Sequence, residues 1–225
     1  FRITSSFANS PLKCIDSSPT LSHLSVRNNM FYSGSEAGIH LFNSNSKLDN
    51  LYIADNVKNS TGYGGAGIWV ENSSISISNS LIVNNSTEHM GSPTGAGGIE
   101  VTNSHLFFDG NTMHNNYGGA ILFKDGAIGT VINSIFWENE ITLMEYGSME
   151  LSTLNVSFSD IQGGWDGEGN IDADPLFCLS DSTDFTLAEN SPCVSTGENG
   201  ADMGAFNIGC DAMLSTNNNV LPFHH

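Results

Sequence analysis

The sequence predicts an all-β solenoid, in which the chain winds in coils that stack through parallel strands, on three observations. A short segment recurs as AGIHLFNS at 37–44, AGIWVENS at 66–73 and GGIEVTNS at 97–104, with a looser copy, GGAILFKDG, at 118–126. Apolar and other residues alternate inside each copy, which is the period of a strand. Asparagine recurs at fixed places after the strands. Self-similarity of this kind indicates stacked repeats rather than a globule.

The recurrent segment is expected to form the first face of each coil. Its core-facing positions are Ile39, Leu41, Ile68, Val70, Ile99, Val101, Ile121 and Phe123. β-Branched and aromatic residues with period 2 favour strands. Because the same column repeats in successive copies, each strand is expected to pair in parallel with its equivalent in the next coil.

Another face follows further along each coil, and it carries a second apolar column. We align that column as Val26, Ile53, Ile82, Met113, Phe136 and Phe158. Asparagine falls into three columns between the faces: Asn43, Asn72 and Asn103 with Asp125; Asn50, Asn79, Asn133 and Asn155; and Asn29, Asn56, Asn85, Asn116 and Asn139. Asparagine tolerates left-handed backbone, so three columns predict three corners. The expectation is about six or more three-faced coils with asparagine-rich corners.

The chain divides into three parts. Residues 1–161 are expected to form the coils, and their start is expected to be an excerpt of a longer chain or the start of a mature one. Residues 162–210 are expected to form an irregular capping tail, and 211–225 a polar end or linker. The loops lengthen after the third asparagine column, at 30–37, 57–66 and 86–97. Insertions in repeat proteins collect on a binding face. The first face and these loops are therefore the expected functional surface.

Charge excludes several partners. The 225 residues contain 24 Asp and Glu against six Lys and Arg, a formal net charge of -18. Nucleic acid requires a stripe of basic residues that is missing. No apolar run is long enough to span a bilayer. A strongly acidic surface fits an extracellular protein, and it can concentrate divalent cations.

The tail carries the most specific motifs. It reads GNIDADPLF at 169–177, DFTL at 184–187, SPC at 191–193 and DMGAF at 202–206. In these elements, and in its repeats, the chain resembles the secreted bacterial right-handed parallel β-helix proteins of the pectin-lyase-like class. The resemblance implies a right-handed coil, secretion, a disulfide between Cys178 and Cys193 around the DFTL strand, and often attachment to a cell surface. It leaves Cys210 without an obvious partner.

The tail also has an expected physical role. An open coil end exposes unpaired strand edges that recruit other chains unless they are covered. We expect the cover to come from Phe177, Phe185, Leu187 and Phe206.

Outward positions of the first face suggest a carbohydrate site. They form two ladders, His40, Trp69, Glu100 and Leu122, and Phe42, Glu71, Thr102 and Lys124. Exposed aromatic rings stack on sugars. Glu71 and Glu100 are expected about 8 Å apart between backbones, within the roughly 6.5–9.5 Å separation of an inverting carboxylate pair. The alternative is that these are solvated ladder residues, with Trp69 under a loop.

Other signals are weaker. Asp166, Glu168, Asp172 and Asp174 alternate like calcium ligands, although the family resemblance assigns part of this stretch to capping. No other cofactor is expected. Asn59 opens a sequon in a loop and is the candidate glycosylation site.

Taken together, the sequence favours a secreted, non-catalytic structural or adhesive module whose partners are an extracellular glycan, a surface protein or copies of itself end to end. The polygalacturonase motif set is missing, and of the basic residues that a uronate lyase of this fold would use, only Lys124 lies on the ladder face. The alternative is a polysaccharide lyase, glycoside hydrolase or carbohydrate-binding module using Glu71, Glu100 and Lys124 with His40, Phe42 and Trp69.

Overall fold

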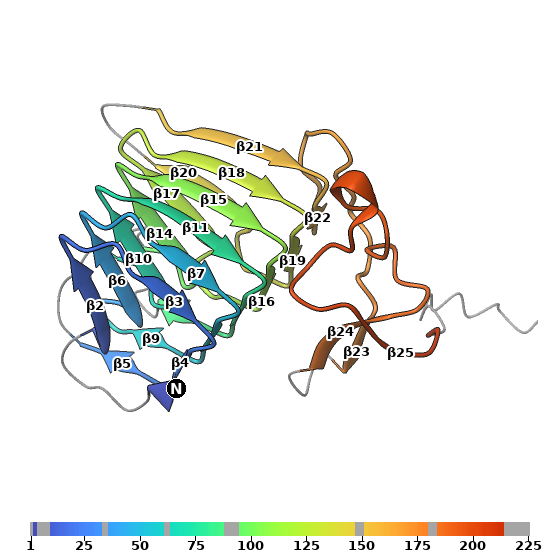
Figure 1. Ribbon diagram of the computed structural model, residues 1–225, viewed down its shortest axis with the longest axis horizontal. Helices are drawn as coiled ribbons and strands as arrows, with labels where there is room; N and C mark the ends of the chain where they lie inside the picture. Colours follow the sequence, from blue (N-terminus) through green and yellow to red (C-terminus); the bar gives the residue numbers. More distant parts are fainter. Residues whose placement is uncertain are drawn as a thin grey trace, which may run out of the picture.

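The computed structural model describes residues 2–3, 10–32, 36–60, 64–87, 95–146, 151–179 and 184–213. In these residues the chain forms a parallel β-helix of stacked coils, followed by a tail with a small sheet of its own (Figure 1). The prediction of an all-β solenoid is confirmed.

Three sheets form the walls of the described coils, and all their strands pair in parallel. Sheet A contains β1 (Arg2–Ile3), β4 (Ser25–Arg27), β8 (Tyr52–Ala54), β12 (Leu81–Val83), β16 (Thr112–His114), β19 (Ile135–Trp137) and β22 (Asp160–Ile161). Sheet B contains β2 (Leu12–Ile15), β6 (Ile39–Phe42), β10 (Ile68–Glu71), β14 (Ile99–Thr102), β17 (Ile121–Lys124) and β20 (Leu143–Tyr146). Sheet C contains β3 (Thr20–Ser22), β7 (Lys47–Asp49), β11 (Ser74–Ser78), β15 (His105–Asp109), β18 (Ile128–Ile132) and β21 (Thr153–Ser157).

A single core runs through the coils. Ile39, Ile68, Ile99 and Ile121 pair in register across sheet B, as predicted, and all are fully buried in the same cluster. Burying each such side chain contributes roughly 1.5–3 kcal/mol. The core therefore forms by adding one layer of side chains for each coil.

The glycine that precedes the first strand allows adjacent coils to approach closely. A Cβ on Gly67 would lie 2.6 Å from the carbonyl oxygen of Gly98, and one on Gly98 would lie 2.3 Å from that of Ala120. Both distances are shorter than a van der Waals contact. The repeated glycine is therefore required by packing between coils.

Two asparagine columns mark corners with left-handed backbone. At the first corner Asn43, Asn72, Asn103 and Asp125 have φ between 44° and 52°. At the second corner the equivalent residues are Asn50, Asn79, Gly110, Asn133 and Phe158. The alignment of the last coil was wrong: Asn155 lies in the middle of β21, and Ile161 rather than Phe158 continues the inner column beside Phe136.

The third column differs from the other two. Its bend falls one residue earlier, at Asn28, Asp55, Asn84, Asn115 and Glu138, all with positive φ. The predicted asparagines instead turn inward and hydrogen-bond to one another. Asn29, Asn56, Asn85, Asn116 and Asn139 form a chain in which each Nδ2 donates to the next Oδ1 at 2.8–3.0 Å.

A fourth sheet was not predicted. Sheet D contains β5 (Met30–Phe31), β9 (Val57–Lys58) and β13 (Ser86–Thr87), which follow the third corner. These strands begin the three long loops that the sequence showed. The middles of those loops, 33–35, 61–63 and 88–94, lie outside the described residues.

The tail packs mainly on the outside of sheet A. Sheet E contains β23 (Phe177–Leu179), β24 (Asp184–Ala188) and β25 (Ile208–Cys210), and Figure 1 shows it beside β16 and β19. Phe177, Phe185 and Leu187 join Leu81 and Val83 of sheet A in a second buried cluster. The expectation that they cover the coil end was wrong, because Leu81, Val83 and Ile135 present apolar side chains on the outside of sheet A, where the tail packs.

Other residues continue the last coil. Asn170 Oδ1 accepts the amide of Ser159 at 3.0 Å, and Ile171 forms an isolated bridge with Asp160. Phe206, which was expected in the cover, is 38% exposed. Main-chain hydrogen bonds from the Ile161 amide to Ile171 O and from the Ile171 amide to Ser159 O, both 2.9 Å, also extend the end of the coil. Residues 214–225 of the polar end lie outside the described residues.

The disulfide also differs from the expected one. Cys178 is bonded to Cys210, whereas Cys193 is a free, buried thiol. Strand β24 pairs with β23 on one side and β25 on the other, which brings Cys178 and Cys210 within a Cα separation of 6.0 Å. Cys193 instead donates its thiol to Asp160 Oδ2 at 3.1 Å.

Candidate functional site

The outer positions of sheet B form the two ladders that the sequence predicted. His40, Trp69, Glu100 and Leu122 are paired in register across β6, β10, β14 and β17. Phe42, Glu71, Thr102 and Lys124 form the second ladder, two residues further along the same strands. The fold therefore brings all the candidate carbohydrate and catalytic residues onto one face.

The ladder residues nearest the loop are buried, neither solvated nor open as a sugar platform. His40, Trp69 and Glu100 are 4%, 6% and 0% exposed. The rings of His40 and Trp69 stack with centroids 4.0 Å apart. A Cβ on Gly64 would lie 3.1 Å from the Trp69 ring, so the loop backbone rests directly on the indole. Trp69 is thus under a loop, and its ring is not an open platform.

A buried charged cluster lies beside this stack. Lys124 Nζ is 3.2 Å from Glu100 Oε1, and both side chains are almost fully buried. Lys58 Nζ donates to the carbonyl oxygen of Gly64 at 2.8 Å, and Lys58 is 1% exposed. The two lysines flank one carboxylate in a region with little water, where charge interactions are strong.

The titration of the cluster follows from its burial. Burial raises the pKa of Glu100, and Lys124, Lys58 and the Gly64 amide oppose that shift. Burial lowers the pKa of Lys58 to about 8, against the attraction of Glu100. A lysine of this kind exchanges its proton near neutral pH, which is a common property of functional sites. Structural ion pairs can show the same shift.

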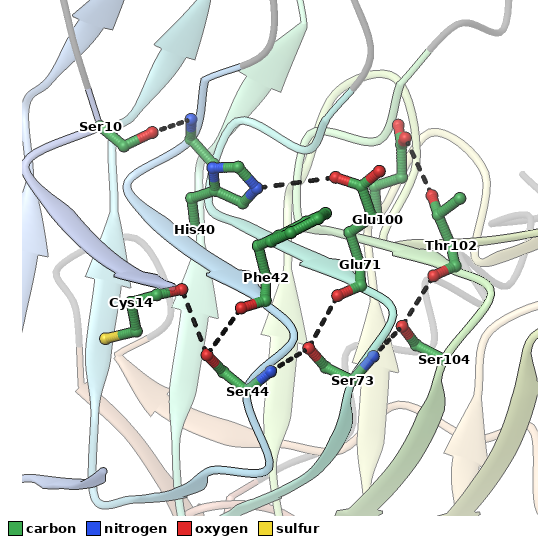
Figure 2. A network of polar contacts seen from close by, with 11 residues as sticks. Ser10, Cys14, His40, Phe42, Ser44, Glu71, Ser73, Glu100, Thr102 and Ser104 are labelled. Carbon is green, nitrogen blue, oxygen red and sulfur yellow. Dashed lines mark hydrogen bonds and ion pairs between the residues drawn. The ribbon is translucent and has the colours of Figure 1, made fainter. Parts of the chain in front are cut away.

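His40 and Glu71 lie at the edge of the cluster. Burial, followed by repulsion from Lys13 and Lys58, lowers the pKa of His40 to about 4. His40 is therefore neutral at pH 7, and its 3.9 Å approach to Glu71 Oε2 is not an ion pair there. Burial and the nearby Glu100 raise the pKa of Glu71. Figure 2 shows the Glu71 carboxylate turned toward the imidazole.

A serine ladder fixes the backbone beside this face. The amide of Ser44 donates to Ser73 Oγ, and the amide of Ser73 donates to Ser104 Oγ, both at 2.9 Å (Figure 2). Each hydroxyl also donates to the carbonyl oxygen two residues earlier. The strand ends carrying Phe42, Glu71 and Thr102 are consequently held in one register.

Sequence reasoning missed Lys58. It lies outside the recurrent segment, so it was not placed on the ladder face. Its only signal was the length of the loop, which we linked to function without identifying a strand. Sheet D places Lys58 between Phe31 and Thr87. From there its side chain reaches Gly64, whose backbone lies against Trp69 of sheet B.

The family follows from the comparison with known proteins. The model of the right-handed β-helix region matches residues 56–201. The chain belongs to this family. No curated protein and no solved structure gives a significant match.

In this right-handed β-helix the remaining candidate residues are those for calcium binding and for glycosylation. Among the described residues, no three His, Cys, Asp or Glu side chains gather as a metal site requires, and this includes the calcium candidates Asp166, Glu168, Asp172 and Asp174. Asn59 is exposed, as a glycosylation acceptor must be, and its modification stays a prediction. The described part of the right-handed β-helix holds no helix long and apolar enough to cross a bilayer.

Proposed function

We propose that this right-handed β-helix is a secreted, non-catalytic module that acts as a rigid structural or adhesive unit at a cell surface or in an extracellular fibre. The observation that carries the proposal is the inward asparagine ladder. Asn85 accepts the Asn56 amide and Nδ2 and donates to Asn116, and all these groups are buried. A chain of satisfied buried hydrogen bonds rigidifies a structure.

The chemistry of sheet B supports a structural role. The carboxylate of Glu100 contacts Lys124, and the amine of Lys58 is bonded to Gly64. An acid or base must reach a substrate atom within hydrogen-bond distance. In this arrangement the charged groups contact one another and the loop, so they hold the loop on the sheet.

Secretion is supported by the disulfide. The Cys178–Cys210 bond joins two strands of the tail sheet. Disulfides persist in oxidising, extracytoplasmic compartments. The resemblance of the tail motifs to those of secreted bacterial β-helix proteins also supports secretion, as does the acidic composition.

Sheet C is the face that can contact a partner. The outer positions of sheets A and B are largely buried, whereas those of β11, β15 and β18 are exposed or half-buried. Phe107 and Ile128 are 47% and 39% exposed there. We propose this face for contact with a surface protein or an extracellular glycan. End-to-end association of copies is the other mode that fits a stacked coil.

The second candidate is a carbohydrate-active site on sheet B. It is favoured by one observation: both ring nitrogens of His40 and Nε1 of Trp69 are buried without a hydrogen-bond partner. Buried polar groups of this kind usually have one. A loop that opens over Glu71 and Glu100 would give a sugar access to them.

One screen separates the two functions. The full chain is incubated with a panel of polysaccharides and assayed for depolymerisation and for glycan binding, with Trp69→Ala and Glu100→Gln as variants. We expect no turnover, and glycan binding that survives both substitutions. Turnover that disappears in the variants would overturn the structural proposal and assign the enzyme function. Circular dichroism checks that each variant is folded.

A further inference from the structure

The loop between β22 and β23 is built as a rigid turn. The amide of Gly164 donates to the carbonyl oxygen of Ile161 at 2.8 Å, and Gly163 and Gly164 both have positive φ. Asn170 Nδ2 then donates to the carbonyl oxygens of Trp165 and Val156, each at 3.1 Å. The main chain of this loop is therefore fixed on the last coil before any ligand arrives, which lowers the entropy cost of binding.

An open groove lies along this loop. It has a volume of about 770 Å³ and is lined by Gly163, Gly164, Trp165, Asp166, Asn170, Ile171 and Asp172. Trp165 is 36% exposed, whereas Trp69 is 6% exposed. An indole that lines a groove on a fixed turn presents aromatic surface to a ligand. The two carboxylates supply the polar side.

The charged Asp, Glu, Lys and Arg residues of the chain after Lys124 are all acidic. Sixteen of the 24 acidic residues follow Lys124, and none of the Lys and Arg residues does. Asp166 and Asp172 are exposed, and neither forms an ion pair with a described residue. Burial raises the pKa of Asp160, and repulsion from Asp172 and Asp174 adds to that rise.

We propose that this groove binds an organic ammonium group, with the cation over the indole of Trp165 and Asp166 and Asp172 as its counterions. Ammonium ions are attracted to the face of tryptophan more strongly than to other aromatic rings. A neutral sugar could also stack on the ring and donate hydroxyl hydrogen bonds to the carboxylates, but only a cation also gains from their unneutralised charge. Charge complementarity therefore selects the cation. This inference does not depend on the proposed scaffold function.

The test uses ligand-observed NMR on the full chain at fixed ionic strength. Tetramethylammonium is the probe, and tert-butanol is a neutral probe of similar shape. Methyl glucoside and calcium chloride are tested separately as alternative ligands. We expect tetramethylammonium to bind in the millimolar range and the neutral probe to bind on the order of tenfold more weakly.

Matched variants locate the site. Trp165→Ala should weaken tetramethylammonium binding by roughly tenfold, whereas Trp165→Phe should retain part of it. Asp172→Asn should weaken it by several fold. Glu168→Gln removes the same charge from the same loop but outside the groove lining, so it should have little effect.

Several results would overturn the proposal. They are the absence of tetramethylammonium binding, equal binding of the neutral probe, preferential binding of the sugar or of calcium, and an equal effect of Glu168→Gln and Asp172→Asn. The last result would mean that the probe senses only the general negative field. Unchanged circular dichroism in each variant ensures that a loss of binding reflects the groove.

Discussion

Asparagine has two distinct roles at the corners of this β-helix. Exposed asparagines such as Asn43 and Asn72 take the left-handed backbone that turns the chain. Buried ones such as Asn56 and Asn85 donate and accept between coils and also bond a carbonyl oxygen of the previous coil. Only the second role leaves buried polar groups unsatisfied when the side chain is removed.

Asn85→Ala should therefore destabilise the fold by about 2–4 kcal/mol, because it removes the acceptor of the Asn56 amide and Nδ2 and the donor to Asn116. Asn84→Gly is the matched control. It changes the adjacent exposed residue, whose φ of 56° glycine adopts freely, so its cost should stay below about 1 kcal/mol. Urea unfolding followed by circular dichroism measures both. Equal losses would mean that the ladder adds nothing beyond the turn.

Asp160 carries the clearest pH dependence. It is fully buried, accepts the Ala173 amide and the Cys193 thiol, and has a pKa raised to about 6, first by burial. The folded state therefore binds its proton more tightly than the unfolded state. The resulting stability is present below the unfolded pKa of about 3.8 and is lost as the pH rises through about 6.

The difference in unfolding free energy between the natural chain and Asp160→Asn should therefore rise by roughly 2 kcal/mol as the pH falls from about 7 to about 4. Subtracting the variant cancels His114, whose pKa burial lowers against the opposing Glu138 and which acts in the opposite direction. A flat difference curve from urea unfolding at several pH values would show that Asp160 is not buried as an acid.

At the scale of elements, the tail covers the outer side of sheet A, so a strand there can be apolar on both faces. Strand β12 does not alternate between apolar and polar residues, because both of its faces are covered. Ile82 faces the core, whereas Leu81 and Val83 face the tail. His114 of β16 packs against Phe177 and Phe185 in the same way. The tail is thus part of the packed body, held on sheet A by apolar contacts and closed on itself by one disulfide.

Replacing Cys178 and Cys210 together by alanine should destabilise the tail by about 3–4 kcal/mol, from the loop entropy of a crosslink that spans 32 residues. Denaturation with and without reductant measures the loss. Peptide mapping under non-reducing conditions should recover the Cys178–Cys210 pair. A crosslinked Cys178–Cys193 peptide would contradict the Cys178–Cys210 bond and support the pairing that the family resemblance implied.

The whole molecule has an uneven charge distribution. All of the Lys and Arg residues lie at or before Lys124, and the buried ones, Lys58 and Lys124, are already engaged in the sheet B cluster. The tail and last coils therefore repel one another at low ionic strength. Self-repulsion of this kind destabilises a compact state.

Raising sodium chloride from about 10 mM to about 1 M shortens the screening distance from about 30 Å to about 3 Å. The melting temperature should rise by several degrees, since the free energy gained is on the order of 1–2 kcal/mol. Differential scanning calorimetry measures it, with the salt raised in steps so that the rise can be compared with the shortening of the screening distance. A melting temperature that falls with salt would indicate that favourable ion pairs outweigh the repulsion.

The sequence alone determined the coil, because a coil is a local and repeated structure. The columns from Ile39 to Ile121, the glycine before each strand and the first asparagine corner all follow from residues that recur at equivalent places. The same reasoning failed in the last coil, where the repeat drifts and Asn155 was mistaken for a corner.

Tertiary structure alone decided what covers each face. Whether Trp69 is open or buried, where Phe185 packs and which thiol bonds Cys178 all depend on contacts between segments far apart in the chain. A periodic pattern specifies which side of a strand is apolar, but not which distant surface will meet it. The carbohydrate candidates were thus placed correctly in register, whereas their burial was set by the loop that packs over them.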